Sequence, residues 1–460
     1  MVSTRGRAWF AALLIGASAS ACSLLFDFQA CENDSHCGAG QACSAGVCVE
    51  GNADTRIEIS ENITVDTIWE SGNTYVLTDI IHIENGATLT IRSGVTVLGE
   101  QGSALVVVRG SRLESRGTEF EPVVMTSALA LGQRSAGDWG GVAMLGRAEV
   151  NQPNALLEGL VDASRAGFGG TEDDWSCGVL EYTRIEFAGF ALKLDEELNG
   201  LTLGGCGSGT VIDHVQIHLG KDDGIEIFGG SVDLQHVVIT RAQDDSLDWD
   251  RGWRGDAQFI AIQQDAGGDN GLECDNWKTD NEAAPRSAPQ LYNVTLIGSG
   301  DPGASQRGAT LKEGTAGTIR NALFIDHPVE SLDVKGPSTV VQIQNEALSV
   351  RNSLFFGAGS TGDHFFPTIS EESAAEDDDE GFDEATYFAE STQANVFSID
   401  PQIAGSHDLL EPGWVPSADL SGIGVKPPGD GFFNEAANFP GAFAPGVTPW
   451  TENWTAYPEN

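Results

Sequence analysis

Basic residues are scarce in this sequence. Lys and Arg together number 24 among 460 residues, against 68 Asp and Glu, and the formal net charge at pH 7 is −44. A chain this acidic repels phosphate groups, which argues strongly against nucleic acids and anionic lipid surfaces as partners. Cations and neutral or cationic polymers are the partners that this charge favours.

Helical spacing of apolar residues is missing from the long central part, residues 199–334. After the N-terminus, no apolar run reaches the ~18 residues that a membrane-spanning helix needs. Short stretches in which apolar and polar residues alternate are present instead, and this period of two is typical of β-strands with one face turned inward. Gly, Asn and Asp pairs between the stretches predict tight turns. We therefore expect an all-β protein that is exported rather than integral to a membrane.

Two short phrases recur along the central part. Copies of the first, such as Asn-Gly-Leu-Thr-Leu and Asp-Gly-Ile-Glu-Ile, lie at 199–203, 223–227, 245–249, 270–274, 307–311 and 330–334. Copies of the second lie at 180–185, 212–217, 234–239, 291–296, 319–324 and 350–355. Self-similarity at roughly 20 to 50 residues indicates stacked units that share one core. The sequence predicts a right-handed parallel β-helix, a solenoid in which each copy is one coil.

Aligning the coils places polar residues in two columns. The column expected to point outward contains Thr202, Glu226, Asp248, Glu273, Thr310 and Asp333. The column before it contains Asn199, Asp223, Asp245, Asn270, Arg307 and Glu330. Neighbouring strands lie about 4.8 Å apart, and two unit charges at that distance repel by roughly 3 kcal/mol at an effective dielectric near 20.

Stacked carboxylates of this kind are expected to bind a hard cation, to hold some carboxyl groups protonated, or to line a groove. Calcium suits the cluster because its ligands are oxygens. The candidate ligands are Asp222, Asp223, Glu226, Asp244, Asp245, Asp248, Asp250 and Glu273. The alternative is a solvated acidic face that Arg241, Arg251 and Arg254 partly neutralise.

Two enzyme alternatives use the same columns. Asp223 precedes Asp244 and Asp245 by one coil, which resembles the stacked acids of polygalacturonase-type glycoside hydrolases. Diagonal neighbours on adjacent strands lie near the roughly 6.5–9.5 Å that an inverting hydrolase needs. However, the Gly-His-Gly and Arg-x-Lys that those enzymes carry on the following coils are missing. A calcium-dependent lyase with Arg251 or Arg254 as its base is the second alternative.

The isolated histidines have a structural interpretation. His214 and His236 align with Asn293, Asn321 and Asn352 in the second phrase, which predicts a stacked polar column. No Ser or Cys nucleophile is identified beside them, so the pattern does not indicate a catalytic triad.

The N-terminus carries export signals. Residues 1–21 combine basic residues, a short apolar run and small residues, which predicts a signal peptide. Cys22 ends a lipobox-like Ala-Ser-Ala-Cys and is the candidate lipidated residue, in which case a lipid anchors the protein to the bacterial outer membrane or cell surface. Cys31, Cys37, Cys43 and Cys48 then crowd into a spacer, residues 22–55, and predict two disulfides; a metal site is the alternative.

The remaining cysteines fall within the solenoid. Cys177 and Cys206 each open a coil and are expected to bridge adjacent turns. Cys274 aligns with inward apolar residues and is expected to be a buried free thiol.

The chain divides further by composition. Residues 56–360 are expected to form the β-helix, and residues 147–176 a long loop on one side. The acid-rich residues 361–396 predict a solvated loop. Residues 397–460 hold aromatic residues without a period and are expected to pack on the last coils.

Several motifs together resemble a known family. They are Gly-Asp-Trp-Gly-Gly at 137–141, Asn-Gly-Leu-Thr-Leu-Gly-Gly at 199–205, Asp-Asp-Gly-Ile-Glu-Ile-Phe-Gly-Gly at 222–230, Asp-Asp-Ser-Leu-Asp-Trp-Asp at 244–250, Asn-Val-Thr-Leu-Ile-Gly at 293–298, and Gly441-Ala-Phe with Trp450 and Trp454. The sequence resembles a family of exported bacterial parallel β-helix proteins, mostly surface lipoproteins, over roughly residues 60–455. The resemblance implies a fold and a location but no established reaction.

We therefore expect a surface lipoprotein that acts as a structural or binding module. Polysaccharide or another cell-surface component is the candidate ligand, and calcium the candidate support. A polysaccharide-degrading enzyme, either a glycoside hydrolase or a lyase, is the alternative.

Overall fold

The computed structural model describes residues 41–44, 47–50, 55–160, 162–193, 196–368, 379 and 381–460. The chain forms two compact units, Met1–Asp54 and Thr55–Asn460. In the first unit, β1 (Gln41–Ser44) and β2 (Val47–Glu50) form an antiparallel pair in which Cys43 is the register partner of Cys48. The expected signal peptide, Cys22, Cys31 and Cys37 lie outside the described residues.

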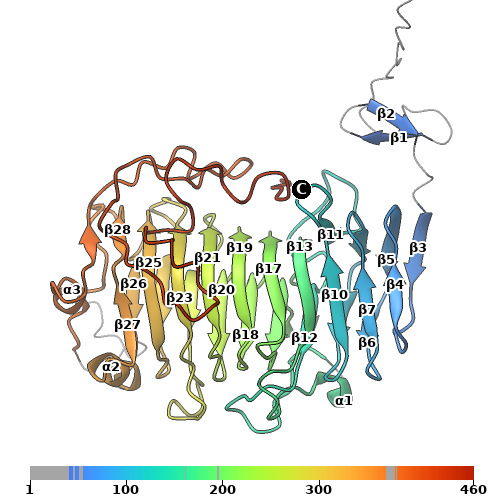
Figure 1. The fold of residues 1–460 in the computed structure, drawn as a ribbon, viewed down its shortest axis with the longest axis horizontal. Coiled ribbons are helices and arrows are strands. Elements are labelled where there is room, and N and C mark those ends of the chain that lie inside the picture. The colour runs from blue at the N-terminus through green and yellow to red at the C-terminus, as the bar shows by residue number, and fades with distance from the viewer. Residues whose placement is uncertain are drawn as a thin grey trace, which may run out of the picture. The chain divides into compact units, whose positions relative to one another are not determined.

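The second unit is a right-handed parallel β-helix, as the sequence predicted (Figure 1). Its strands form two sheets, here called the long sheet and the short sheet. The long sheet consists of β3 (Thr55–Ile59), β4 (Thr67–Trp69), β5 (Asn73–Leu77), β7 (Thr88–Ile91), β8 (Thr96–Gly99), β10 (Arg112–Arg116), β11 (Val123–Ser127), β13 (Gly178–Glu186), β17 (Val211–His218), β19 (Asp233–Thr240), β21 (Asp256–Gln263), β23 (Gln290–Ile297), β25 (Gly317–Ile325), β27 (Leu348–Arg351), β28 (Leu354–Phe356) and β29 (Val396–Phe397).

The short sheet consists of β6 (Ile80–Ile83), β9 (Ala104–Val107), β12 (Val142–Leu145), β16 (Leu201–Gly204), β18 (Ile225–Phe228), β20 (Leu247–Asp250), β22 (Asn270–Cys274), β24 (Arg307–Leu311) and β26 (Leu332–Val334). A small antiparallel pair, β14 (Ala191–Lys193) and β15 (Glu196–Glu197), lies outside both sheets. The helices are α1 (Ala163–Ala166), α2 (Pro337–Gln344) and α3 (Glu384–Phe388). None of the described helices is long and apolar enough to cross a membrane.

The core fills the space between the sheets. Ile227, Trp249 and Cys274 stand in register on successive short strands and are fully or almost fully buried. Because each burial removes a large apolar side chain from water, every coil adds several kcal/mol to the stack. Cys274 is a buried free thiol, as expected, and Cys177 and Cys206 form the expected disulfide.

Each central strand of the long sheet bends at one residue. The register skips that residue, which adopts a left-handed conformation with φ between 45° and 61°. These residues form a column, here called the left-handed column: Tyr182, His214, His236, Phe259, Asn293, Asn321 and Asn352. The alignment of the two histidines with the three asparagines is therefore confirmed. Asn tolerates this conformation well, because its side chain can hydrogen-bond locally.

Residues 147–176, here called the insert, pack on one part of the short sheet. Leu157 and Phe168 of the insert join Val106, Leu145 and Phe228 in a separate apolar cluster on the outer face of the short sheet. α1 lies within this loop. The insert therefore covers the outer face from β9 to β18.

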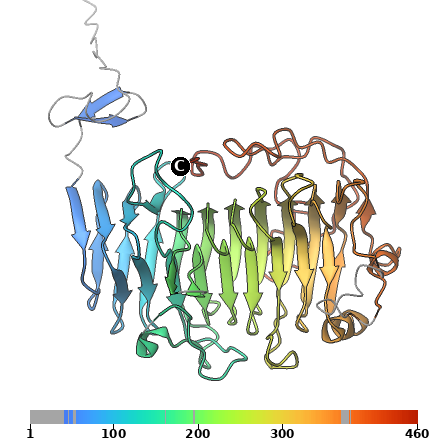
Figure 2. The ribbon, with the colours of Figure 1, turned by 180° about the vertical axis from the view of Figure 1, so that it is seen from behind.

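Residues 397–460, here called the C-terminal segment, run along the outside of the long sheet (Figures 1 and 2). Trp414, Phe443 and Trp454 pack there against apolar residues such as Val238 and Leu323. The sequence predicted contacts with the last coils only. The observed contacts extend much further toward the N-terminal end of the stack and reach β17 and residue 132.

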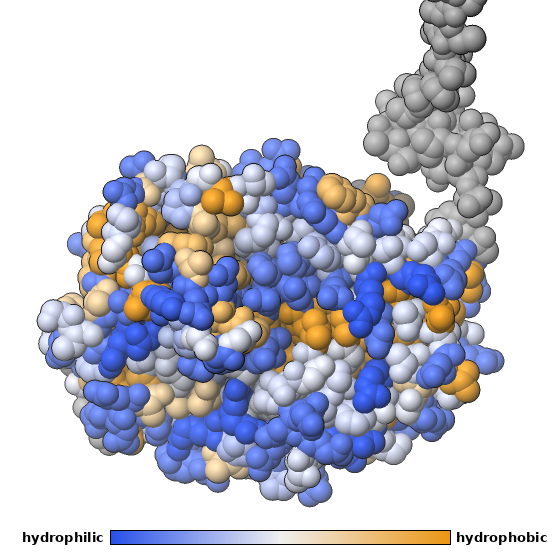
Figure 3. Space-filling model, in the orientation of Figure 1, coloured by the Kyte–Doolittle hydropathy of each residue, from blue (hydrophilic) through white to orange (hydrophobic). Residues whose placement is uncertain are grey.

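The stack also continues past residue 360. Phe365, Phe366 and Phe388 belong to the core, and β29 pairs with β28. Part of the expected acidic loop, residues 369–378 and 380, lies outside the described residues. The space-filling view shows hydrophilic residues over most of the visible face, which agrees with the acidic composition (Figure 3).

Candidate functional site

The outward column of the short sheet stacks as the alignment predicted. Glu226 is the register partner of Asp248, and Asp248 is the partner of Glu273. The column continues through Thr310 to Asp333. Three carboxylates therefore follow one another on adjacent strands.

The outer face of the short sheet changes character along the stack. At the edge of the part that the insert covers lie Glu226 on β18 and Asp248 on β20, and no Lys or Arg in the described ranges forms an ion pair with either of them. From Glu273 onward, basic residues neutralise the acids: Lys312 Nζ lies 2.9 Å from Glu273 Oε1, and Arg307 Nε lies 3.1 Å from Asp333 Oδ2. The unneutralised charge is therefore confined to one place between the insert and the ion pairs.

Asp223 lies beside Glu226 and Asp248. Oxygens of Asp223, Glu226 and Asp248 lie within 4.8 Å of one another, and we call these three residues the acidic cluster. Asp223 is 7% exposed and Asp248 8% exposed, whereas Glu226 is only half-buried. A ligand would therefore approach from the side of Glu226.

Hydrogen bonds to the cluster leave one buried oxygen without a partner among the residues that the structure describes. Asn199 Nδ2 donates to Glu226 Oε2 at 2.6 Å, and the backbone N–H of Asp245 donates to Asp223 Oδ1 at 3.0 Å. Asp248 Oδ1 is buried and has no hydrogen-bond partner in the described part of the chain. An unpartnered buried oxygen is costly, so this atom marks a place where a ligand would be stabilising.

Burial is the largest cause of the altered acidity here. Burial and the neighbouring carboxylates raise the pKa values of Asp223 and Asp248 well above their usual range. Burial raises the pKa of Glu226 to about 8, although Asn199 and Arg251 oppose this shift. The pKa of Asp250 rises to about 6, again mainly because of burial.

Further carboxylates surround the cluster. Asp222 and Asp223 share one group of close oxygens with Asp244, and Asp244 shares another with Asp245 and Asp269. The structure thus brings together most of the predicted metal ligands in overlapping groups at one corner of the coils. Every donor in them is a carboxylate oxygen, which is the ligand that calcium prefers.

The residues proposed for catalysis have structural contacts. Asp223 and Asp245 are buried, and each accepts a hydrogen bond from the backbone of the next coil. Arg251 lies over the ring of Phe228, 4.2 Å from its centroid, with Nε 3.5 Å from Asp250. Arg254 contacts Asp173 of the insert. Such contacts are typical of structural residues.

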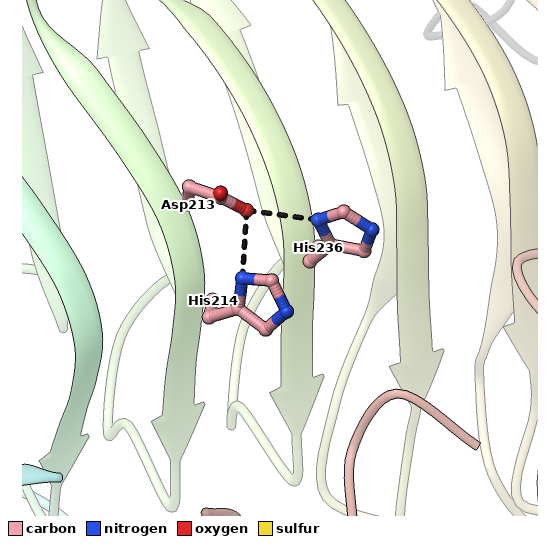
Figure 4. A group of neighbouring side chains, drawn as sticks. All are labelled: Asp213, His214 and His236. Atoms are coloured by element: carbon pink, nitrogen blue, oxygen red, sulfur yellow. Dashed lines mark hydrogen bonds and ion pairs between the residues drawn. The ribbon is translucent and has the colours of Figure 1, made fainter. Parts of the chain in front are cut away.

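A second group of titratable residues lies on the long sheet. Asp213 lies beside His214 and His236, two members of the left-handed column (Figure 4). Burial would raise the pKa of Asp213, but the two imidazoles lower it well below its usual range. Our sequence interpretation did not include Asp213. The sequence did contain a signal for Asp213. The second phrase reads Ile-Asp-His at 212–214 but Leu-Gln-His at 234–236, so an acid stands beside the aligned histidines in one copy only.

The fold and the acidic cluster define a parallel β-helix with a polar site on the outer face of one sheet. The family described as pectate-lyase like beta helix domain matches residues 61–397, and the chain belongs to this family. No curated protein and no solved structure matches the chain.

Proposed function

We propose that this protein is a surface lipoprotein that binds an acidic polysaccharide through calcium held at the acidic cluster. The observation that carries the proposal is the buried, unpartnered Oδ1 of Asp248 beside Glu226 and Asp223. Calcium takes six to eight oxygen ligands at about 2.3–2.6 Å, so one ion offsets the repulsion among the three carboxylates. Asp222, Asp244, Asp245, Asp250 and Glu273 add negative charge around it.

The polymer follows from the family and from the charge. A polysaccharide-related role is what the pectate-lyase-like domain suggests. Three protein carboxylates leave some calcium positions open, and the carboxylate of a uronic acid can occupy them. Without the cation, a chain of net charge −44 repels such a polymer, so binding should depend strictly on calcium.

Binding is favoured over degradation. A lyase needs a base that removes a proton from the carbon next to the uronate carboxyl group while the glycosidic C–O bond breaks. Arg251 is the candidate because it is near enough to lower the pKa of Glu226. Its guanidinium is stacked on Phe228 and paired with Asp250, which leaves the binding role as the better supported one. A hydrolase is less favoured still, because Asp223 and Asp245 each hold the backbone of the next coil.

Calorimetry on the chelator-treated full chain tests the metal site. Calcium should bind to the wild type, and Asp248→Asn should weaken binding at least about tenfold, since a ligand is lost. Glu452→Gln is the control, because it removes an exposed charge outside the cluster. Equal calcium binding by wild type and Asp248→Asn would refute the metal site.

Co-sedimentation with polygalacturonate tests the polymer, with a neutral glucan as the second arm. Binding in calcium but not in magnesium or chelator is expected. Calcium binding without retention of either polymer would leave a structural metal and refute the polysaccharide role. Release of unsaturated, ultraviolet-absorbing products would show the lyase, and release of saturated reducing ends would show the hydrolase.

The anchor has its own test. Mass spectrometry of the membrane fraction should find diacylglycerol on Cys22, and Cys22→Ala should release the protein into the soluble fraction. Export without lipid at Cys22 would contradict this part of the proposal and leave the calcium site unaffected.

A further inference from the structure

Asp213, His214 and His236 meet on two neighbouring strands of the long sheet. Asp213 and His214 belong to β17, and His236 belongs to β19. Asp213 Oδ1 lies 2.9 Å from His214 Nδ1 and 2.8 Å from His236 Nδ1. Figure 4 shows both rings turned toward the same carboxylate oxygen. We infer that these three residues form a binding site for a divalent transition-metal ion, with zinc as the best match.

Hydrogen bonding accounts for only one of the two imidazole contacts. His236 Nδ1 is hydrogen-bonded to Asp213 Oδ1. His214 Nδ1 is buried and, among the described residues, has no hydrogen-bond partner, although the same oxygen is only 2.9 Å away. His214 Nδ1 is therefore close to Asp213 Oδ1 without forming a hydrogen bond to it. Two metal ligands have this relationship when both point at a third atom, the metal ion, that lies between them. Ligands about 2.1 Å from a tetrahedral zinc ion lie roughly 3.4 Å from each other, so the nitrogens would have to move outward by only about 0.5 Å from the oxygen to admit the ion.

Aromatic neighbours hold the two rings in place. Tyr182 stacks on His214 at 4.3 Å, His214 stacks on His236 at 4.4 Å, and Phe259 stacks on His236 at 5.0 Å. From the C-terminal segment, the edge of Trp450 contacts His236 at 5.2 Å. Ligands with fixed rotamers lose little entropy on binding, so the site is preorganised.

The left-handed column shows that these histidines differ from their neighbours. Asn293 Nδ2 donates to the carbonyl oxygen of Phe439, and Asn321 Nδ2 donates to that of Val425, each at 2.7 Å. These asparagines attach the C-terminal segment. His236 and His214 stand one and two coils earlier than Phe259, and their Nδ1 atoms face the Asp213 carboxylate. Trp450 packs against both rings, but within the described structure no hydrogen bond from these Nδ1 atoms to the segment explains why histidine stands at the two positions.

The donor set selects the metal. Two imidazole nitrogens and one carboxylate oxygen suit zinc and other first-row transition metals, whereas calcium prefers oxygen ligands alone. Asp213 is 32% exposed, so water can reach the ion and complete its coordination. The site is thus chemically distinct from the acidic cluster on the short sheet.

Spectroscopy and calorimetry on the chelator-treated, oxidised full chain test the inference. The wild type should bind one equivalent of zinc in excess calcium, which occupies the carboxylate groups of the short sheet. Cobalt as the probe should give ligand-field bands without a thiolate charge-transfer band. Because the ion links β17 to β19, zinc should also raise the thermal midpoint. Absence of binding, or a thiolate band that assigns the metal to cysteines, would overturn the inference whatever the variants do.

Two variants locate the site. His236→Asn introduces the residue that the left-handed column carries at 293, 321 and 352, so it suits the backbone conformation. Asp213→Asn retains the shape of the side chain. Each should weaken zinc binding at least about tenfold. The matched control is His407→Asn, which removes an exposed His–Asp pair with Asp326 and should leave binding unchanged. Wild-type affinity in both variants, with circular dichroism confirming the fold, would place the metal elsewhere and overturn the inference.

Discussion

Asp223 accepts a hydrogen bond from the backbone N–H of Asp245, one coil further along the stack, at 3.0 Å. Asp245 in turn accepts one from the backbone N–H of Asn270 at 2.7 Å. Both carboxylates are buried, so they satisfy backbone donors at the corner of the coils while adding negative charge to a region that is shielded from water. The same residues therefore join the coils and place buried negative charge there, which a proton or a cation must neutralise.

Because protons can neutralise these buried carboxylates, the stability of the folded chain should depend on pH. Burial raises the folded-state pKa of Glu226 to about 8 and those of Asp223 and Asp248 well above the usual range. The folded chain then holds protons that the unfolded chain has lost, so the free energy of unfolding should fall as pH rises from about 4 to about 8. The total change should be on the order of a few kcal/mol.

Urea unfolding in chelator at several pH values measures this decrease. Calcium should reduce it, because the ion replaces the protons as the partner of the carboxylates. Asp248→Asn should flatten the curve in chelator, whereas Glu452→Gln should leave it unchanged. A metal-free wild type that gains stability between about pH 5 and pH 8 would contradict the raised pKa values.

Much of the fold was predictable because a solenoid repeats locally. The alternation within each phrase determines which side chains face the core, and the spacing of the phrases determines the register. The partners Glu226, Asp248 and Glu273 were therefore identified correctly from the alignment alone. The pairing of Cys177 with Cys206 followed in the same way, since each opens a coil.

What depends on long-range packing was not predictable. Nothing in the repeats indicates that the insert covers β9 to β18, or that Lys312 neutralises Glu273. The aromatic residues of the C-terminal segment have no period, so their path along the long sheet was not visible in the sequence. Asp213 was missed because it occupies an ordinary polar position of a strand, and only contact with the next coil gives it a role.

The disulfide should contribute measurably to stability. Cys177 and Cys206 are buried and have a sequence separation of 29, and closing a loop of this length destabilises the unfolded chain by about 3.6 kcal/mol. Cys177→Ala with Cys206→Ala should lower the free energy of unfolding by about that amount. Urea unfolding with and without reductant measures the effect.

A single-cysteine variant provides the control for this measurement. Cys274→Ala removes a buried free thiol, so its stability should still decrease when reductant is added, as in the wild type. In the double variant, in contrast, the unfolding of residues 55–460 should not respond to reductant, because the disulfides expected among Cys31, Cys37, Cys43 and Cys48 belong to the other unit. A double variant as stable as the wild type would show that the bridge does not constrain the unfolded state.

The attachment of the C-terminal segment should weaken in acid through His218. Its Nε2 lies 2.9 Å from the carbonyl oxygen of Pro458, which can only accept, so Nε2 carries a proton in the docked state, and its Nδ1 lies 2.7 Å from Thr240 Oγ1. Burial lowers the pKa of His218 to about 4, although the Pro458 carbonyl opposes this shift. The undocked state takes up a proton below about pH 6.5 and the docked state does not, so docking should lose on the order of a few kcal/mol as pH falls to about 4.

Hydrogen exchange of residues 454–460, corrected for the intrinsic rate, should therefore rise steeply in acid. His218→Gln keeps a donor for Pro458 but cannot titrate, so its corrected exchange should vary much less, while His407→Gln should behave as the wild type. Equal acid sensitivity in His218→Gln and the wild type would show that another group controls the segment.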